Sequence, residues 1–129
     1  MEYEPIPAAD EALAKEIIGA AIEVHRALGP GFIEFIYKRA MCHELRLRGI
    51  PFVCEKKILV PYKGTLIPGQ RCDLLVGERV IAELKAVTEI HPLYEAKVIS
   101  YLKATKLRLG LIINFHVRLL KDGINRVVR

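Results

Sequence analysis

The sequence predicts one α/β domain in which helices flank a mixed β-sheet. Apolar residues recur every three or four positions in three stretches, which is the period of an amphipathic helix. Short and nearly continuous apolar runs lie between and after these stretches, and such runs are typical of buried strands. The chain has 129 residues, of which 52% are hydrophobic and 27% charged. This composition fits a single folded domain over residues 1–129 rather than a disordered chain.

The N-terminal part is expected to be an arm followed by two helices. Residues 1–9 contain two prolines and are predicted to form a flexible arm. A first helix is predicted from Asp10, a candidate N-cap, to Leu28, and glycines at positions 29 and 31 end it. A second helix is predicted over residues 32–48. Its inward residues are expected to be Ile33, Ile36, Tyr37, Ala40 and Leu47.

The rest of the chain is predicted to form strands around a third helix. Pro92 suits the first turn of that helix, which should run to about Lys106. A C-terminal hairpin is predicted from the apolar runs 117–120 and 124–128, with a turn at Asp122-Gly123. The main sheet is expected to have four strands, with the second irregular near Pro68-Gly69. These strands are residues 52–62, 66–76, 80–85 and 109–115.

Charge, cysteines and hydropathy exclude several classes of protein. The net charge is +5, which permits a polyanionic partner without requiring one. The three cysteines form no CxxC pair, so neither a zinc site nor a disulfide framework is expected. No apolar run is long enough to span a membrane, and the acidic N-terminus does not resemble a signal peptide. The expected location is therefore the cytoplasm.

Charged residues lie at the ends of two apolar runs, residues 72–76 and 80–85, within the predicted strands. Asp73 belongs to one apolar run, and Glu83 and Lys85 belong to the next. Charge is costly in a buried strand unless it is compensated, and two carboxylates that share a site raise each other's pKa unless a cation lies between them. A divalent metal is the simplest such cation, and a neighbouring lysine can orient an attacking water. The pattern indicates a metal-dependent hydrolase, while the alternative is a solvent-facing Glu83–Lys85 charge pair.

The turn between these two strands decides whether the acids meet. Glu83 and Lys85 are two positions apart and share one side of a strand. A three-residue loop would pair Val76 with Val80. Asp73 would then lie directly opposite Glu83, with Cβ atoms roughly 5 Å apart, which lets both carboxylates bind one ion. A two-residue loop would put the acids on opposite faces, so the metal hypothesis predicts the longer loop.

A glycine, a glutamate and a tyrosine stand at fixed spacing near the second helix, as Gly31, Glu34 and Tyr37. On pattern alone, Glu34 is a solvated acid favoured by the helix dipole. In this spacing, however, the three residues resemble the GxxExxY motif that names a small bacterial and archaeal family within the PD-(D/E)XK nuclease superfamily. Other segments that look like this family are residues 24–30, 71–76, 81–86 and 111–115. The resemblance covers roughly residues 12–128.

The resemblance implies a restriction-endonuclease-like αβββαβ core that holds a metal ion. The implied ligands are Asp73, Glu83, the backbone carbonyl of Leu84, and Glu34, the last directly or through water. Lys85 would orient or help to deprotonate the nucleophilic water. Magnesium, or else manganese, is the implied ion, because it prefers hard oxygen ligands.

Three further residues are expected to support the site or contact the substrate: Tyr37, Lys97 and Tyr101. Related exonucleases often carry Gln-x-x-x-Tyr on the helix after the third strand, and here Lys97 stands in place of the glutamine, four positions before Tyr101. Residues at this spacing share a helix face. A lysine there could bind a phosphate, or it could pair with Glu34 or Asp73 and displace the metal. Tyr37 is expected in the core with its hydroxyl bonded.

The sequence thus predicts a nuclease that hydrolyses phosphodiester bonds of DNA or RNA with magnesium or manganese. The alternative is a non-catalytic module that keeps this fold and binds nucleic acid or a protein. A homodimer is compatible with either function. Basic side chains that could contact a phosphate backbone are Lys56, Lys57, Lys63, Lys103, Lys106 and Arg108.

Overall fold

The computed structural model describes residues 4–129, and it confirms the α/β class. In chain order the elements are α1 (Ala8–Leu28), α2 (Glu34–Leu47), β1 (Phe52–Tyr62), β2 (Thr65–Val76), β3 (Val80–Lys85), α3 (Pro92–Thr105), β4 (Leu109–Asn114), the short 3-10 helix η1 (Leu120–Gly123) and β5 (Ile124–Val128). Helix α1 begins at Ala8 with Pro7 as its N-cap, so the prediction of Asp10 as N-cap is wrong. Residues 1–3 of the predicted arm lie outside the described part of the chain.

All five strands belong to one mixed sheet in the order β1-β2-β3-β4-β5. Neighbouring strands are antiparallel except for β3 and β4, which are parallel and are connected by α3, because a parallel pair needs a crossover. The predicted C-terminal hairpin and four-stranded sheet are wrong. Residues 117–119 form no strand, and β5 joins the sheet as the antiparallel neighbour of β4. This pairing buries Val127 to 2% exposure beneath α3.

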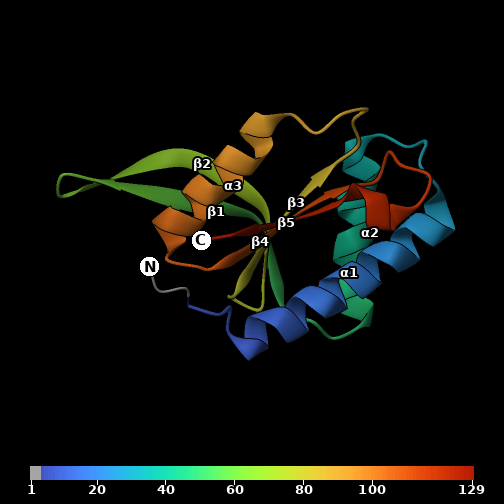
Figure 1. Ribbon diagram of the computed structural model, residues 1–129, viewed down its shortest axis with the longest axis horizontal. Helices are drawn as coiled ribbons and strands as arrows, with labels where there is room; N and C mark the ends of the chain where they lie inside the picture. The colour runs from blue at the N-terminus through green and yellow to red at the C-terminus, as the bar shows by residue number, and fades with distance from the viewer. Residues whose placement is uncertain (1–3) are drawn as a thin grey trace.

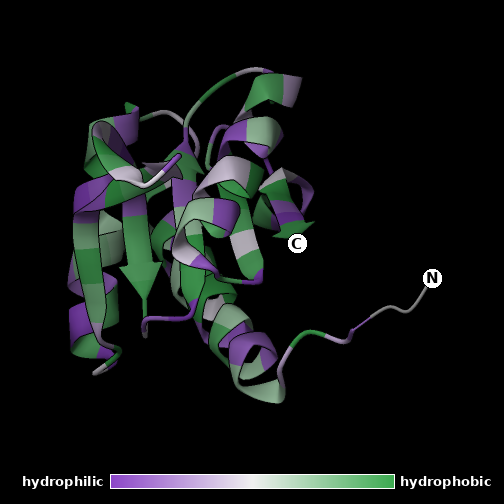
Figure 2. Ribbon diagram, turned by 90° about the vertical axis from the view of Figure 1, so that its left-hand side faces the viewer, coloured by the Kyte–Doolittle hydropathy of each residue, from purple (hydrophilic) through white to green (hydrophobic). Residues whose placement is uncertain are grey.

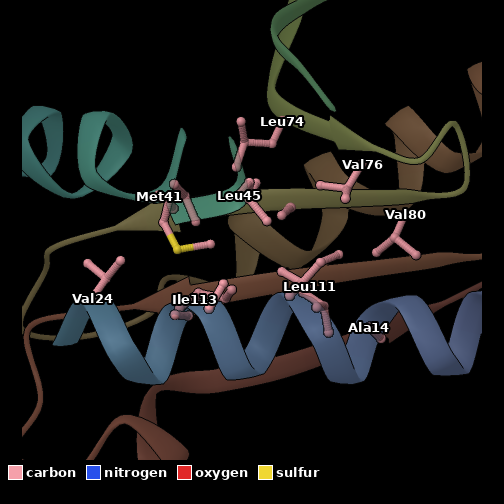
Figure 3. Packing of buried hydrophobic residues seen from close by; sticks show 14 of the residues in the cluster. Ala14, Val24, Met41, Leu45, Leu74, Val76, Val80, Leu111 and Ile113 are labelled. Carbon is pink, nitrogen blue, oxygen red and sulfur yellow. The ribbon is translucent and has the colours of Figure 1, made fainter. Parts of the chain in front are cut away.

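Helices α1 and α2 cover one face of the sheet, and α3 covers the other (Figure 1). The larger core lies beneath α1 and α2, where strand residues such as Leu74, Val80 and Leu111 pack against helix residues such as Ala14 and Met41 (Figure 3). Hydropathy follows this layering, since the strands are largely hydrophobic while the helices alternate between apolar and polar faces (Figure 2). No helix within residues 4–129 has the length and apolar character needed to cross a membrane.

The buried stripe of α2 differs from the expected one. Tyr37, Met41 and Leu45 are fully buried at a spacing of four residues. Ile33 is 70% exposed, because the helix begins after it and its backbone is extended. Leu47 is 69% exposed, since two positions beyond Leu45 a side chain lies on the opposite side of a helix.

Strands β1 and β2 are much longer than β3 and project beyond it as a twisted ribbon (Figure 1). Strand β3 pairs only with residues 74–76 of β2, and residues 59–71 are all exposed. The pairing of β1 and β2 shifts register opposite Pro68-Gly69, which confirms the predicted irregularity. Residues 56–71 are called the basic hairpin here, because they include no acid and carry Lys56, Lys57, Lys63 and Arg71.

Candidate active site

The turn between β2 and β3 has the longer of the two predicted loops. Val76 pairs with Val80 across three residues, and the antiparallel pairing continues to Leu74 and Ala82. The next position in this register places Asp73 opposite Glu83. The geometric condition for an acid pair, which was predicted from the sequence, is therefore met.

Asp73 and Glu83 replace the regular strand pairing with bonds made by their side chains. The backbone N–H of Asp73 donates to Glu83 Oε1 at 2.8 Å. In return, the backbone N–H of Leu84 donates to Asp73 Oδ2 at 2.8 Å. Each carboxylate is thus fixed by one oxygen to the opposite strand, which makes the arrangement rigid.

Strand β2 reverses its faces at Asp73, because the residues on either side of it lie in different cores. Residues two apart on a regular strand share a face. Cys72 nevertheless lies in the core beneath α3, while Leu74 lies in the core beneath α1 and α2. On β1, Glu55 has a left-handed backbone with φ +51°, opposite Asp73 in the register. The local reversal leaves Asp73 at the border between the two cores.

Lys38, which was not predicted as a site residue, forms ion pairs with the acids of the site. Lys38 Nζ is 2.9 Å from Asp73 Oδ1 and 3.2 Å from Glu34 Oε2, and it lies 3.8 Å from Glu55 Oε1. Burial by itself would lower the pKa of Lys38, but the hydrogen bonds and charges of Asp73 and then Glu34 outweigh it and raise the pKa well above its usual range. Glu34 therefore reaches Asp73 through this ammonium. The contact with Glu34 and Asp73 that was considered for Lys97 belongs to Lys38.

Glu83 is the most strongly perturbed acid of the site. Burial raises its pKa, and the neighbouring charge of Asp73 raises it further, to about 7. The bond from the Asp73 N–H and the charges of Lys85 and Lys38 act in the opposite direction but do not cancel the increase. A buried acid in this state accommodates a cation readily, because the cation removes the cost of ionisation.

Lys85 lies on the same strand as Glu83 but turns toward α3. Its ammonium is 4.5 Å from the centre of the Tyr94 ring, a cation–π contact. The loop that follows is held by Asn114, a buried side chain that pairs with both backbone groups of Val87 at 3.0 and 2.8 Å. Asn114 was not predicted as a site residue, although its polar side chain at the end of an apolar strand was a usable signal.

Tyr37 is buried away from the acids. Its hydroxyl donates to the carbonyl of Gly29 and accepts the N–H of Phe32 at 3.1 Å, and its ring stacks on Phe115 at 4.5 Å. The prediction of a core tyrosine with a bonded hydroxyl is confirmed. These contacts fix the loop before α2, which begins at Glu34.

Lys97 and Tyr101 line a separate hollow on the α3 side, with a volume of about 330 Å³. The Tyr101 hydroxyl donates to Gln70 Oε1 at 3.2 Å. Burial raises the pKa of Tyr101, and the charge of Glu83 raises it further. Lys97 and Tyr101 do share a helix face, as the spacing predicted, and the charge of Glu83 acts on that face.

A profile of the PD-(D/E)XK nuclease superfamily matches residues 11–127. The chain belongs to this superfamily. Among solved structures, an alkaline exonuclease from Laribacter hongkongensis has a similar fold, with a TM-score of 0.52 at 17% identity over 98% of this chain and 72% of that one. No curated protein matches the chain. The superfamily part of the resemblance is thereby confirmed, and so is the fold class.

Nucleases of the PD-(D/E)XK superfamily typically use divalent metals. Within the described residues, no three His, Cys, Asp or Glu side chains gather around one point as they stand. The carboxylates of Asp73 and Glu34 do converge on one cation, the Lys38 ammonium. Hard carboxylate oxygens around a positive charge suit Mg²⁺ or Mn²⁺. The donor set therefore fits the ion, although a lysine holds the position.

Proposed function

We propose that the protein is a metal-dependent nuclease that hydrolyses phosphodiester bonds of DNA or RNA. Membership of the superfamily supports this class of reaction. The observation that carries the proposal is the reciprocal bonding of Asp73 and Glu83, in which each carboxylate accepts a backbone N–H of the neighbouring strand. The motif at Gly31, Glu34 and Tyr37 further suggests the GxxExxY family, and the three unpaired cysteines suggest a cytoplasmic protein.

In this mechanism, Asp73, Glu83 and the carbonyl of Leu84 would hold the ion, and Glu34 would take part directly or through water. A divalent ion bound there would lower the pKa of a water and neutralise charge that develops on the phosphate. Lys85 Nζ, which lies 4.5 Å from the centre of the Tyr94 ring in this structure, would donate a hydrogen bond to the attacking water and orient it.

The basic hairpin is the expected contact with the nucleic acid. Its ribbon projects from the sheet next to Asp73, and its exposed lysines and arginine have no acid among them (Figure 1). Basic side chains that neutralise phosphates supply affinity that does not depend on base sequence. Tyr101 and Lys97, which face the base of the hairpin, would extend this contact.

A second candidate is a non-catalytic module that binds nucleic acid or a protein through the same surface. The contact of Lys38 with Asp73 favours it, because an ammonium there can satisfy the acid without a metal. This module would bind nucleic acid through the basic hairpin but would not cleave it.

The deciding experiment is a cleavage assay with magnesium or manganese on single- and double-stranded DNA and RNA. We expect native protein to cleave and Lys85→Ala to lose at least about a hundredfold in rate, the lower range for a group that assists proton transfer. Lys15→Ala, on the exposed side of α1, serves as the matched control and keeps the native rate. Cleavage that survives Lys85→Ala would contradict the assignment of the site. Binding without cleavage by native protein would support the module.

A further inference from the structure

Lys38 is held at the site by three acids from three different elements. Glu34 lies on the same helix, Glu55 on β1 and Asp73 on β2. Its side chain is only 27% exposed, and that of Asp73 is 12% exposed. An exposed lysine with a single acidic partner contributes little to stability. A partly buried lysine with several acidic partners neutralises charges that would otherwise be unpaired.

We infer that Lys38 is a built-in competitor of the metal, so that a divalent ion binds only by displacing its ammonium from Asp73. This inference rests on the cation position of the proposed function and describes how that position is regulated. The ammonium occupies the free oxygen of Asp73, since the other oxygen is bonded to the N–H of Leu84. An ion that uses Asp73 needs that same oxygen.

The surroundings allow the exchange to occur without exposing an unpaired charge. Glu34 is four residues before Lys38 on α2, and this spacing favours a pair on the helix surface. A displaced ammonium can therefore withdraw to Glu34 and Glu55 while it remains paired. The incoming ion would gain Glu83, which is a partner of no ion pair among residues 4–129. The exchange thus moves the single positive charge of Lys38 outward and places the two positive charges of the ion between Asp73 and Glu83.

The test measures metal binding rather than activity. Melting temperatures of native protein and Lys38→Gln are followed as Mn²⁺ or Mg²⁺ is added. An ion that binds the folded state raises the melting temperature once its concentration exceeds its dissociation constant, so the concentration required reports the affinity. We expect Lys38→Gln to respond at an ion concentration about tenfold or more below that needed by native protein, which corresponds to about 1.4 kcal/mol. Lys38→Arg keeps the positive charge and should need as much metal as native protein.

Two controls make the result specific. Arg39→Gln removes the same charge from the neighbouring position of α2, where the guanidinium lies over Phe35, and should change the required concentration no more than about twofold. Asp73→Asn in the Lys38→Gln background should abolish the response. Native protein and Lys38→Gln could respond at the same concentration, with Asp73→Asn removing both responses. That result would show that Asp73 binds the metal but that Lys38 does not compete with it. If no variant responds to either ion, the inference and the metal site both fail, whatever the cleavage assay shows.

Discussion

Replacing Glu83 with glutamine should change how the stability of the metal-free protein depends on pH. The pKa of Glu83 is raised in the folded state from 4.5 to about 7, first by burial and then by Asp73. Between these two values the unfolded chain releases the proton while the folded chain keeps it. The folded state then binds more protons, so the free energy of unfolding falls as pH rises. Glutamine stays neutral and removes this dependence.

The expected size follows from the same values. Each unit of pKa corresponds to about 1.36 kcal/mol, so the rise gives an upper bound of about 3 kcal/mol. The stability that Glu83 contributes is fully present below pH 4.5 and is lost as the pH passes about 7. Relative to native protein, Glu83→Gln should gain up to that amount between these two limits. The amide oxygen of the glutamine can still accept the N–H of Asp73, so the fold should be kept.

Urea unfolding in the presence of a chelator, repeated from pH 4.5 to 8, measures this difference directly. Glu89→Gln is the matched control, because Glu89 is exposed and the same change there should stay within about 0.5 kcal/mol of native protein at every pH. A difference between native protein and Glu83→Gln that stays constant over the whole range would refute the reasoning. It would mean that Glu83 is ionised in the folded protein without cost.

Two further predictions concern the loop before α2 and the basic hairpin. Tyr37→Phe should lower the free energy of unfolding by about 2 kcal/mol, because its hydroxyl bonds two backbone groups that would lose their partner. Thermal or urea unfolding measures this loss, with Tyr62→Phe as the control, since Tyr62 is 57% exposed on the hairpin. A loss no larger than that of the control would show that these bonds do not stabilise the fold. Changing Lys56, Lys57 and Lys63 together to glutamine should weaken binding to oligonucleotides. Fluorescence anisotropy at several salt concentrations should also give a shallower slope, by about 0.7–0.9 for each phosphate contact removed. An unchanged slope would exclude the hairpin from the interface.

The order and type of most elements could be predicted because they depend on local pattern. Helical spacing located all three long helices to within a few residues, and apolar runs located the strands of the main sheet. The opposition of Asp73 and Glu83 could also be predicted, because it depends on a loop length and on the two-residue period of a strand. The strand that pairs with β5 could not be predicted. An apolar run such as β5 can pair with a neighbour in sequence or with a distant strand, and the choice depends on which edge is open in the folded sheet.

The sequence by itself determined the class of fold, the two strands that carry the acids, and the core position of Tyr37. Only the tertiary structure decided which cation meets those acids. Lys38 and Asp73 are far apart in the chain, and their contact requires α2 to pack beside β2 at the point where the strand turns over. Charge partners of this kind follow from where elements come together, because a Coulomb interaction depends on distance in space and leaves no period in the sequence.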